Sequence, residues 1–279
     1  MQATSGSEPN DQSANQTPAT RDVMANVLRI YNWPSQAYWR YFEILALRRL
    51  VYDPPILEIG CGDGKLSSLI FSAIDDAIDI NPRSVERCKK NASHVYRRMR
   101  CLDARDLQPT GNGYGTVFAN CVLEHIPDIE TVLHGCHRSL RPGGKLVVTV
   151  PLVRMNEHLL FKSQRYVQLR REQLVHVNLL SESGWSELLN RCRFSVEAVE
   201  PYMSATACRF WDTLDAIACI GRGRYTLAAA LHEIGCAVLP AGARNRLVAS
   251  LSNWLYSKAK KHQGTGPATA ALVVASKRE

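Results

Sequence analysis

The sequence of 279 residues lacks three features, each of which would point to a class of protein. It contains no run of about 18 consecutive apolar residues, so it encodes no helix that could cross a bilayer. Its first twenty residues, MQATSGSEPNDQSANQTPAT, contain no apolar core, so we predict no secretory signal. Its nine cysteines include no C-x-x-C pair, which argues against a zinc ribbon or a disulfide framework and favours a reducing, cytoplasmic location.

The composition is that of an ordinary globular protein, with 46% hydrophobic, 22% charged and 8% aromatic residues. There are 34 Lys and Arg against 26 Asp and Glu, which gives a net charge of +8 at pH 7. This excess is compatible with contact to nucleic acid, an anionic membrane or an acidic substrate, and it selects none of them. Because the basic residues are spread along the chain, we interpret most of them as solvated faces.

Short strands and helices alternate through the first half of the chain. Residues 1–20 hold almost no large apolar side chain and predict a disordered tail, and residues 21–54 predict a helical cap. From residue 55 onward the alternation predicts a doubly wound α/β fold with a mostly parallel sheet. The predicted strands are Ile56–Ile59, Ala77–Ile80, Arg98–Leu102, Thr116–Asn120 and Leu146–Val150, and the predicted helices are Lys65–Ser72, Arg83–Asn91 and Ile129–Leu140.

The pattern changes after Pro151. Residues 206–260 are rich in Ala and Leu at helical spacing, with a turn predicted at Pro240-Ala241-Gly242, and they precede a final β-like run, Ala271–Ser276. We therefore predict a core over residues 55–205, a helical insertion over 206–260 and the last strand of the core within 261–279.

A glycine-rich turn follows the first predicted strand. Gly60-Cys61-Gly62-Asp63-Gly64 separates that strand from a helix, which lets a ligand approach bare backbone. The spacing is G-x-G-x-G, and Lys65 does not continue the G-x-G-x-x-G pattern of a dinucleotide fold. Glu58, just before the turn, would also repel a pyrophosphate.

Three carboxylates occupy successive strand ends around this turn. Asp79 closes the second strand, where a carboxylate can accept both hydroxyls of a ribose, and Asp103 closes the third, within reach of a purine amine. With Glu58 they suit a ligand that carries an ammonium, a ribose, an adenine and a cationic centre but no phosphate.

Five motifs in this order give the sequence a family resemblance. They are LEIGCGDG (57–64), IDINPRSVERCKK (78–90), DARDL (103–107), VFANCVLEHIPD (117–128) and LRPGGKLVVTVP (140–151). The sequence resembles the class I S-adenosylmethionine-dependent methyltransferases, specifically the methyltransferase type 11 group. It departs from the family at Gly115, where the family usually has Asp, and at Ala77, where Gly is common. Residues 206–260 match nothing in the family.

The resemblance implies a sheet of seven strands, the last antiparallel, with S-adenosylmethionine bound across its carboxyl edge. It implies that Glu58 and the turn face the methionine end, that Asp79 holds the ribose and Ile80 the adenine, that Asp103 and Ala104 address the adenine edge, and that Asn120 lines the sulfonium side. The residues that would contact the cofactor are therefore Glu58, Gly60, Cys61, Gly62, Gly64, Asp79, Ile80, Asp103, Ala104 and Asn120.

A general base is needed only for a protonated acceptor, and two histidines are candidates. His125 follows the fourth strand, and His176 opens a segment that in this family folds over the pocket; structural roles for both stay open. His134 and His137 flank Cys136 on one helix without the further ligands that a metal site needs, so we expect a solvated face there and no metal.

The acceptor is left open by the sequence. The position after the fourth strand reads Asn120-Cys121-Val122-Leu123 and lacks the proline pair and aromatic ring with which amino-directed nucleic-acid methyltransferases hold a base. We expect a small-molecule acceptor, a hydroxyl of a natural product, a sugar or a lipid-linked glycan. A protein or nucleic-acid acceptor, and a non-catalytic cofactor-binding member, are the alternatives.

Residues 206–260 also admit three interpretations. Two apolar helices before the last strand would form a lid over the acceptor pocket, a packing layer or homodimer interface, or a membrane-surface element. The last of these is suggested by Lys258, Lys260 and Lys261, which follow Trp254 and Tyr256.

Overall fold

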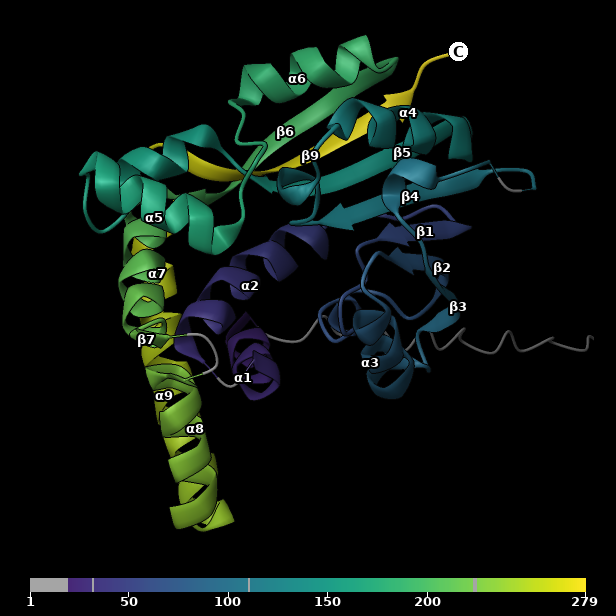
Figure 1. Cartoon of the computed structure of the whole chain (residues 1–279). Helices are drawn as coiled ribbons and strands as arrows, with labels where there is room; N and C mark the ends of the chain where they lie inside the picture. The colour runs from purple at the N-terminus through teal and green to yellow at the C-terminus, as the bar shows by residue number, and fades with distance from the viewer. Residues whose placement is uncertain (1–19, 32, 110, 223–224) are drawn as a thin grey trace, which may run out of the picture.

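The computed structural model describes residues 20–31, 33–109, 111–222 and 225–279 (Figure 1). The predicted tail, residues 1–20, lies outside the described residues except for Thr20. The helical cap consists of α1 (Thr20–Tyr31) and α2 (Pro34–Leu47), which pack on each other. The predicted cap is therefore helical, as its apolar spacing indicated.

A seven-stranded sheet forms the centre of the molecule. Its order is β3-β2-β1-β4-β5-β9-β6, and all neighbouring pairs are parallel except those that β9 makes with β5 and β6. The predicted doubly wound sheet with an antiparallel last strand is confirmed. The strands are β1 (Ile56–Ile59), β2 (Ile74–Asp79), β3 (Tyr96–Cys101), β4 (Tyr114–Asn120), β5 (Leu140–Pro151), β6 (Phe194–Ser204) and β9 (Ala268–Lys277).

Helices cover both faces of the sheet. Successive side chains of a strand point to opposite faces, and here both faces are apolar. In β4, Val117 and Ala119 pack toward α4 (Ile129–Ser139) and α6 (Glu182–Arg191), whereas Phe118 packs toward α2 and α3 (Pro82–Ala92). A third cluster joins α1 and α2 to α7 (Ala205–Ala218) and α9 (Ala241–His262). Helices therefore bury both faces of the sheet, and the loops at the carboxyl ends of its strands are where a ligand can reach the sheet.

Two local predictions are wrong. Lys65–Ser72 forms only one 3-10 turn, η1 (Ser67–Leu69), because the hydroxyl of Ser67 bonds to Glu58 and that of Ser68 to the Lys65 carbonyl. His137 is buried rather than solvated, with its Nε2 atom 2.9 Å from the Arg278 carbonyl oxygen.

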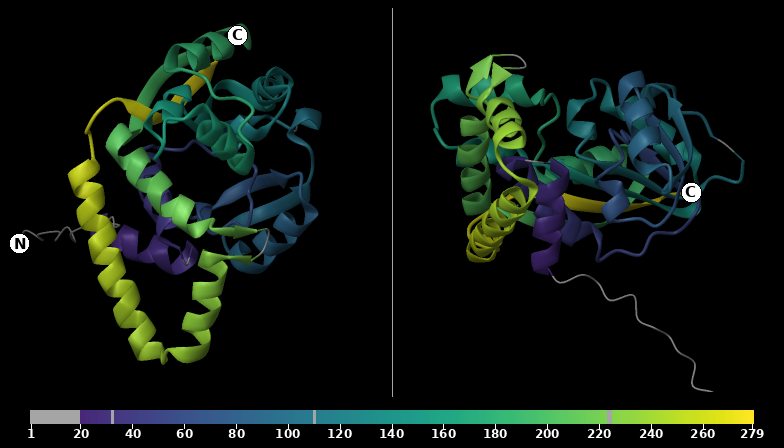
Figure 2. Two further views of the ribbon diagram at one scale, coloured as in Figure 1. Left: turned by 60° about the vertical axis from the view of Figure 1, so that its left-hand side comes forward. Right: turned by 90° about the horizontal axis from the view of Figure 1, so that it is seen from below.

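The predicted helical insertion begins with α7, which packs on the body, and its remainder projects as an arm (Figure 1 and the left-hand view of Figure 2). After α7, a short hairpin of β7 (Gly221–Arg222) and β8 (Tyr225–Thr226) leads into α8 (Leu227–Val238), and α9 returns to the sheet. The turn between α8 and α9 lies where Pro240-Ala241-Gly242 predicted it. Among the described residues, no helix is long and apolar enough to span a membrane.

Three shorter helical segments and α5 complete the chain. The turn η2 (Ala104–Asp106) follows β3, η3 (Leu123–His125) follows β4, η4 (Val153–His158) follows β5, and α5 (Gln164–Leu174) leads into the segment that carries His176. Each of these lies after the carboxyl end of a strand, so the loops with the predicted site residues share one edge of the sheet.

Candidate active site

Three glycines form the turn after β1. Gly60, Gly62 and Gly64 have φ of 73°, 57° and 75°, a region that strains other residues. A Cβ atom on Gly60 would lie 2.4 Å from the Val122 side chain, and one on Gly64 would lie 2.7 Å from Ala92. Gly62 has open space above its Cα atom, so bare backbone faces the cleft at the carboxyl edge.

Glu58 lies beneath this turn and is 3% exposed. Its two carboxylate oxygens accept hydrogen bonds from the hydroxyls of Ser67 and Tyr96, both at 2.6 Å. Burial raises the pKa of Glu58 to about 7. Glu58 also lines a cavity of about 460 Å³ with Cys61, Gly62 and Asn120. Its place at the methionine end stays a prediction, and both of its oxygens already have partners within the protein.

Asp79 stands at the rim of a neighbouring cavity of about 290 Å³. Its Oδ2 atom accepts from the amide of Gly62 at 2.9 Å and its Oδ1 atom from that of Asn81 at 2.8 Å. These bonds hold the carboxylate toward the cleft. Ile80 lines the same cavity and is 64% exposed, which makes an apolar wall available to a planar ring.

Asp103 and Ala104 close the other side of this cavity. Asp103 accepts from the Arg105 amide and forms an ion pair with the Arg105 guanidinium at 2.6 Å. The hydrogen bonds from Arg105 lower the pKa of Asp103. A bare glycine turn, two carboxylates and an apolar wall fit a ribose and an adenine, so the residues present fit the adenosine part of S-adenosylmethionine.

The two departures from the family pattern leave the cleft intact. A Cβ atom on Gly115 would lie 2.4 Å from the Asp53 carbonyl oxygen, so no side chain fits there. Ala77 is a residue of β2 and is fully buried in the core on one face of the sheet. Neither residue lines the two cavities described above.

A buried polar network joins β4 to α2. The Asn120 side chain accepts from the Thr149 hydroxyl at 2.6 Å and donates to Glu43 at 3.3 Å. Glu43 is fully buried and also accepts from Arg40 at 2.6 Å and from the Cys121 thiol at 2.8 Å. The network fixes Asn120 between the cofactor cleft and the next cavity. Glu43 was not predicted from the sequence, although its pairing with Arg40, three residues earlier on an otherwise apolar helix, was a usable signal.

That next cavity, of about 210 Å³, is the candidate acceptor pocket. Tryptophans and charged residues line it together, which suits a small partly aromatic or polar acceptor more than a polymer. Its lining comes from α2, the turn after β4, the segment after α5 and helix α7: Gln36, Trp39, Arg40, Cys121, Glu124, His125, Pro151, Met155, Leu174, His176, Trp211 and Asp215.

Both predicted base candidates line this pocket. Their imidazole rings are 5.4 Å apart between centroids and inclined by 36°. Burial lowers the pKa of His125, and it lowers the pKa of His176 to about 4, so both rings are neutral near pH 7. The Nδ1 atom of His125 lies 3.0 Å from the Val175 carbonyl oxygen, which can only accept, so Nδ1 carries the proton and Nε2 keeps a free lone pair.

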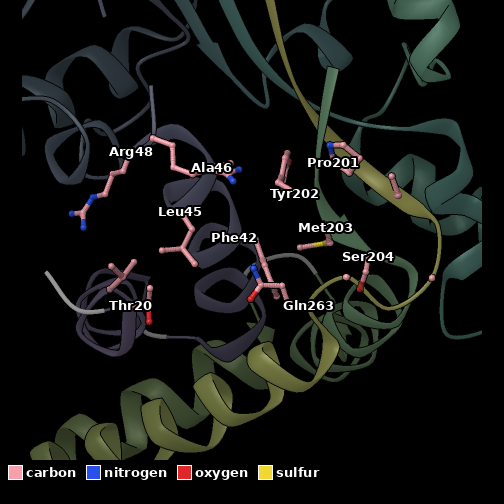
Figure 3. A pocket seen from close by; sticks show the side chains of 15 residues that line it. Thr20, Phe42, Leu45, Ala46, Arg48, Pro201, Tyr202, Met203, Ser204 and Gln263 are labelled. Carbon is pink, nitrogen blue, oxygen red and sulfur yellow. The ribbon is translucent and has the colours of Figure 1, made fainter. Parts of the chain in front are cut away.

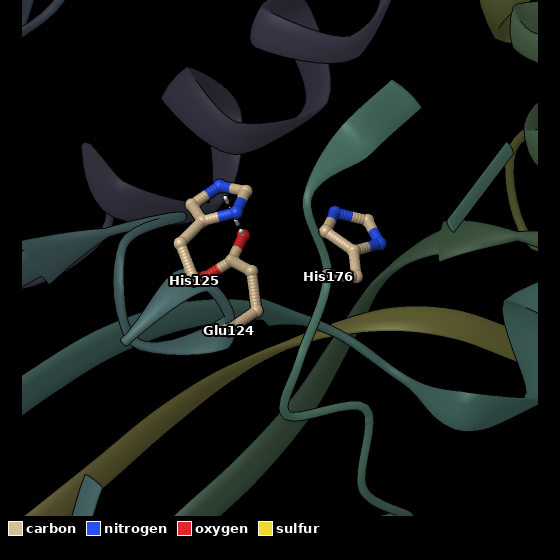
Figure 4. Close-up of side chains that lie close together, drawn as sticks. All are labelled: Glu124, His125 and His176. Carbon is tan, nitrogen blue, oxygen red and sulfur yellow. Dashed lines mark ion pairs between the residues drawn. The ribbon is translucent and has the colours of Figure 1, made fainter. Parts of the chain in front are cut away.

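Glu124 stands beside His125 and was not predicted. It is 1% exposed, and its Oε1 atom lies 3.8 Å from His125 Nε2 (Figure 4). Burial raises the pKa of Glu124 to about 8, and its Oε2 atom has no hydrogen-bond partner. The LEH motif therefore supplies a buried carboxyl as well as a histidine.

These three side chains are also where a divalent cation could be held. Glu124, His125 and His176 each offer one ligand atom, and those atoms lie within 4.8 Å of one another. That the protein uses no metal at this cluster stays a prediction.

A separate cavity of about 690 Å³ lies between α2, β6 and the chain that follows α9 (Figure 3). Phe42, Leu45 and Met203 form part of its apolar wall, and Arg48 and Arg49 lie at its border. It contains none of the predicted cofactor or base residues. In the described part of the chain, α8 and α9 line neither the cofactor cavities nor the acceptor pocket, whereas α7 contributes Trp211 and Asp215 to the pocket.

Comparison with known proteins shows what the chain is similar to. Residues 57–148 match the family model of the type 11 methyltransferase domain. Ubiquinone biosynthesis O-methyltransferases are similar: that of Xanthomonas oryzae pv. oryzae (strain PXO99A) is 31% identical over 100 residues, 34% of this chain and 41% of that protein. That of Xanthomonas euvesicatoria pv. vesicatoria (strain 85-10) is 33% identical over 112 residues, which make up 38% of this chain and 47% of that protein. The chain thus spans less than half the length of these relatives.

Two solved structures share the fold at low identity. An S-adenosylmethionine-dependent methyltransferase from Thermotoga maritima, described as a possible histamine N-methyltransferase, has a TM-score of 0.54 at 14% identity, covering 93% of this chain and all of that one. The 4+2 cyclase SpnF has a TM-score of 0.52 at 17% identity, covering 94% and 97%. These likenesses concern the fold.

The sheet order and the family match together define the class. Residues 57–148 match the type 11 methyltransferase model, and with the observed sheet order they identify a class I S-adenosylmethionine-dependent methyltransferase domain in this chain. S-adenosylmethionine is the cofactor of that class.

Proposed function

We propose that the protein transfers the methyl group of S-adenosylmethionine to a hydroxyl of a small-molecule acceptor. The observation that carries the proposal is the position of a neutral histidine with a free Nε2 lone pair in a small pocket beside the cofactor cavities. The O-methyltransferases among the similar proteins support oxygen as the methylated atom.

The bound cofactor would supply an activated methyl carbon, and the chain's residues would do the rest. Asp79 and the glycine turn would hold and orient the cofactor, and the pocket would hold the acceptor beside it. In the transfer, the acceptor oxygen would gain the methyl group that the cofactor loses, and His125 Nε2 would take up the hydroxyl proton. Trp39 and Trp211, which line the pocket, would reduce the contact of a bound acceptor with water.

A turnover assay tests this proposal. The intact protein is incubated with methyl-labelled cofactor and a panel of hydroxylated aromatics, sugars and lipid-linked glycans, with and without a chelator. We expect transfer to at least one hydroxyl compound, undiminished by the chelator. Cofactor binding without transfer to any compound would favour a non-catalytic member, and transfer only to amines or to protein would refute the hydroxyl assignment. Loss of transfer on chelation would place a cation at Glu124, His125 and His176.

A further inference from the structure

Most of the net charge of the protein lies in the helical arm, which we define as residues 221–262. This segment contains seven Lys or Arg and a single acidic residue, Glu233, and therefore carries a net charge of +6 out of the +8 of the whole chain. The charge is thus concentrated on the element that the methyltransferase family does not explain.

The arm also exposes large apolar side chains. Leu231, Val238, Leu247 and Trp254 leave 49%, 70%, 57% and 43% of their surface uncovered, and Leu239 leaves 37%. Helix α8 contacts α7 and β8, and the left-hand view of Figure 2 shows α8 and α9 separating from the turn that joins them. Leu231 and Val238 are seven residues apart on α8, and Leu247 and Trp254 are seven residues apart on α9, so each pair shares one helix face. Large apolar side chains exposed on a helix face mark a binding surface.

The root of the arm packs on the body, and its tip lies at the opposite end. In α9, Leu255 and Ala259 are fully buried, and Asn253 accepts from Arg21 of α1 at 2.8 Å. At the far end, Val238 and Leu239 form the apolar tip between α8 and α9. Arg244 and Arg246 follow on α9 and, at 1.5 Å per residue, lie about 4–8 Å behind its start.

We propose that this arm docks the protein on an anionic lipid surface. Val238 and Leu239 would enter the boundary between headgroups and acyl chains, and Arg244 and Arg246 would lie at the depth of the lipid phosphates. Interfacial helices insert to about 5–10 Å and combine apolar and basic residues in this way. A second copy fits less well, because two arms of +6 would face each other with only Glu233 on each side to offset the repulsion.

Vesicle co-sedimentation of the full chain tests the proposal. We expect binding to vesicles of phosphatidylcholine with 30% phosphatidylglycerol, and at least tenfold weaker binding to phosphatidylcholine alone. The double variant Val238→Asp, Leu239→Asp should bind anionic vesicles about tenfold more weakly or worse. The matched control is Val51→Asp with Phe161→Asp, which adds the same two charges at exposed apolar residues outside the arm.

Reversing the charge of two arginines in the arm gives a second, independent test. Arg244→Glu with Arg246→Glu should also weaken binding about tenfold, since each basic residue contributes near the surface. The control, Lys90→Glu with Arg138→Glu, makes the same change in net charge on the body, at two exposed positions. All four variants should bind S-adenosylmethionine as the unaltered protein does.

Three results would overturn the proposal. They are no binding of the unaltered protein to anionic vesicles, equal losses in the arm variants and their controls, and a change from dimer to monomer in the tip variant with vesicle binding retained. The last result would assign the tip to a second copy. Because docking does not depend on methyl transfer, the proposal stands or falls separately from the proposed function.

Discussion

His125 Nδ1 lies 3.0 Å from the carbonyl oxygen of Val175, a residue 50 positions further along the chain. Val175 ends α5 with a left-handed backbone, φ 55°, which directs its carbonyl to the pocket side. The segment after α5 therefore determines which nitrogen of His125 is basic. The backbone of one loop thus sets the tautomer of the predicted base on another loop.

Replacing His125 by Ala should lower turnover by about 10²–10⁴-fold, because the acceptor hydroxyl would lose the group that takes its proton. Cofactor affinity should not change. Steady-state kinetics with calorimetry checks both, and His134→Ala, an exposed histidine on α4, is the control. Since burial lowers the pKa of His125, turnover of the unaltered protein should persist below pH 6.5. Near-normal turnover in His125→Ala and in His176→Ala would remove both from the mechanism.

Replacing Asp79 by Ala should weaken binding of S-adenosylmethionine by about 1–3 kcal/mol, since two ribose hydroxyls would lose their shared acceptor. Calorimetric titration measures the change. Asp106→Ala, an exposed carboxylate on the neighbouring turn η2, should bind like the unaltered protein. If Asp79→Ala binds normally, the ribose lies elsewhere.

Replacing Glu124 by Gln should flatten the dependence of stability on pH. Folded Glu124 keeps its proton up to about pH 8, whereas the unfolded residue releases it near pH 4.5. The folded state therefore binds more protons between these values, and its stability falls as the pH rises from about 4.5 to about 8. Denaturant unfolding at pH 5 and pH 8 should show a smaller difference in the variant. An unchanged difference would show that Glu124 is ionised. Glu58, with a pKa of about 7, contributes in the same direction, so some dependence should remain.

Replacing Gly64 by Ala should lower the free energy of unfolding by about 2–4 kcal/mol. The added Cβ would lie 2.7 Å from Ala92 and 2.8 Å from the Cys88 sulfur, in a left-handed backbone. Gly143→Ala has a similar φ of 73° but no atom within 4 Å, so it should cost only about 1–2 kcal/mol. Equal losses in the two variants would show that the packing against α3 contributes nothing.

The strands and the cofactor turn were predictable because their signals are local. Ile56–Ile59 is buried throughout β1, and the turn needs its glycines for backbone and steric reasons that short-range spacing reveals. The start of β5 at Leu140 was not predictable, because Arg141-Pro142-Gly143-Gly144 is a sequence typical of the end of a helix. In the structure Leu140 pairs with Tyr114 of β4, and an irregularity in the pairing separates this contact from the regular part of the strand.

The interior of the pocket was not predictable, because its contacts connect distant segments. Glu43 bonds to Asn120, 77 positions away, and Trp211 reaches the pocket from a helix without a family counterpart. Glu124 was present in the LEH motif, but its burial and its missing partner depend on packing that no local pattern records.

Calorimetric titration of the intact protein with S-adenosylmethionine tests the central claim most directly. The cleft of Gly62, Asp79 and Ile80 predicts one molecule bound per chain with a dissociation constant in the micromolar range, about −8 kcal/mol. The demethylated product should bind with similar affinity. The absence of any binding of either compound would contradict the assignment of this cleft to the methyl donor.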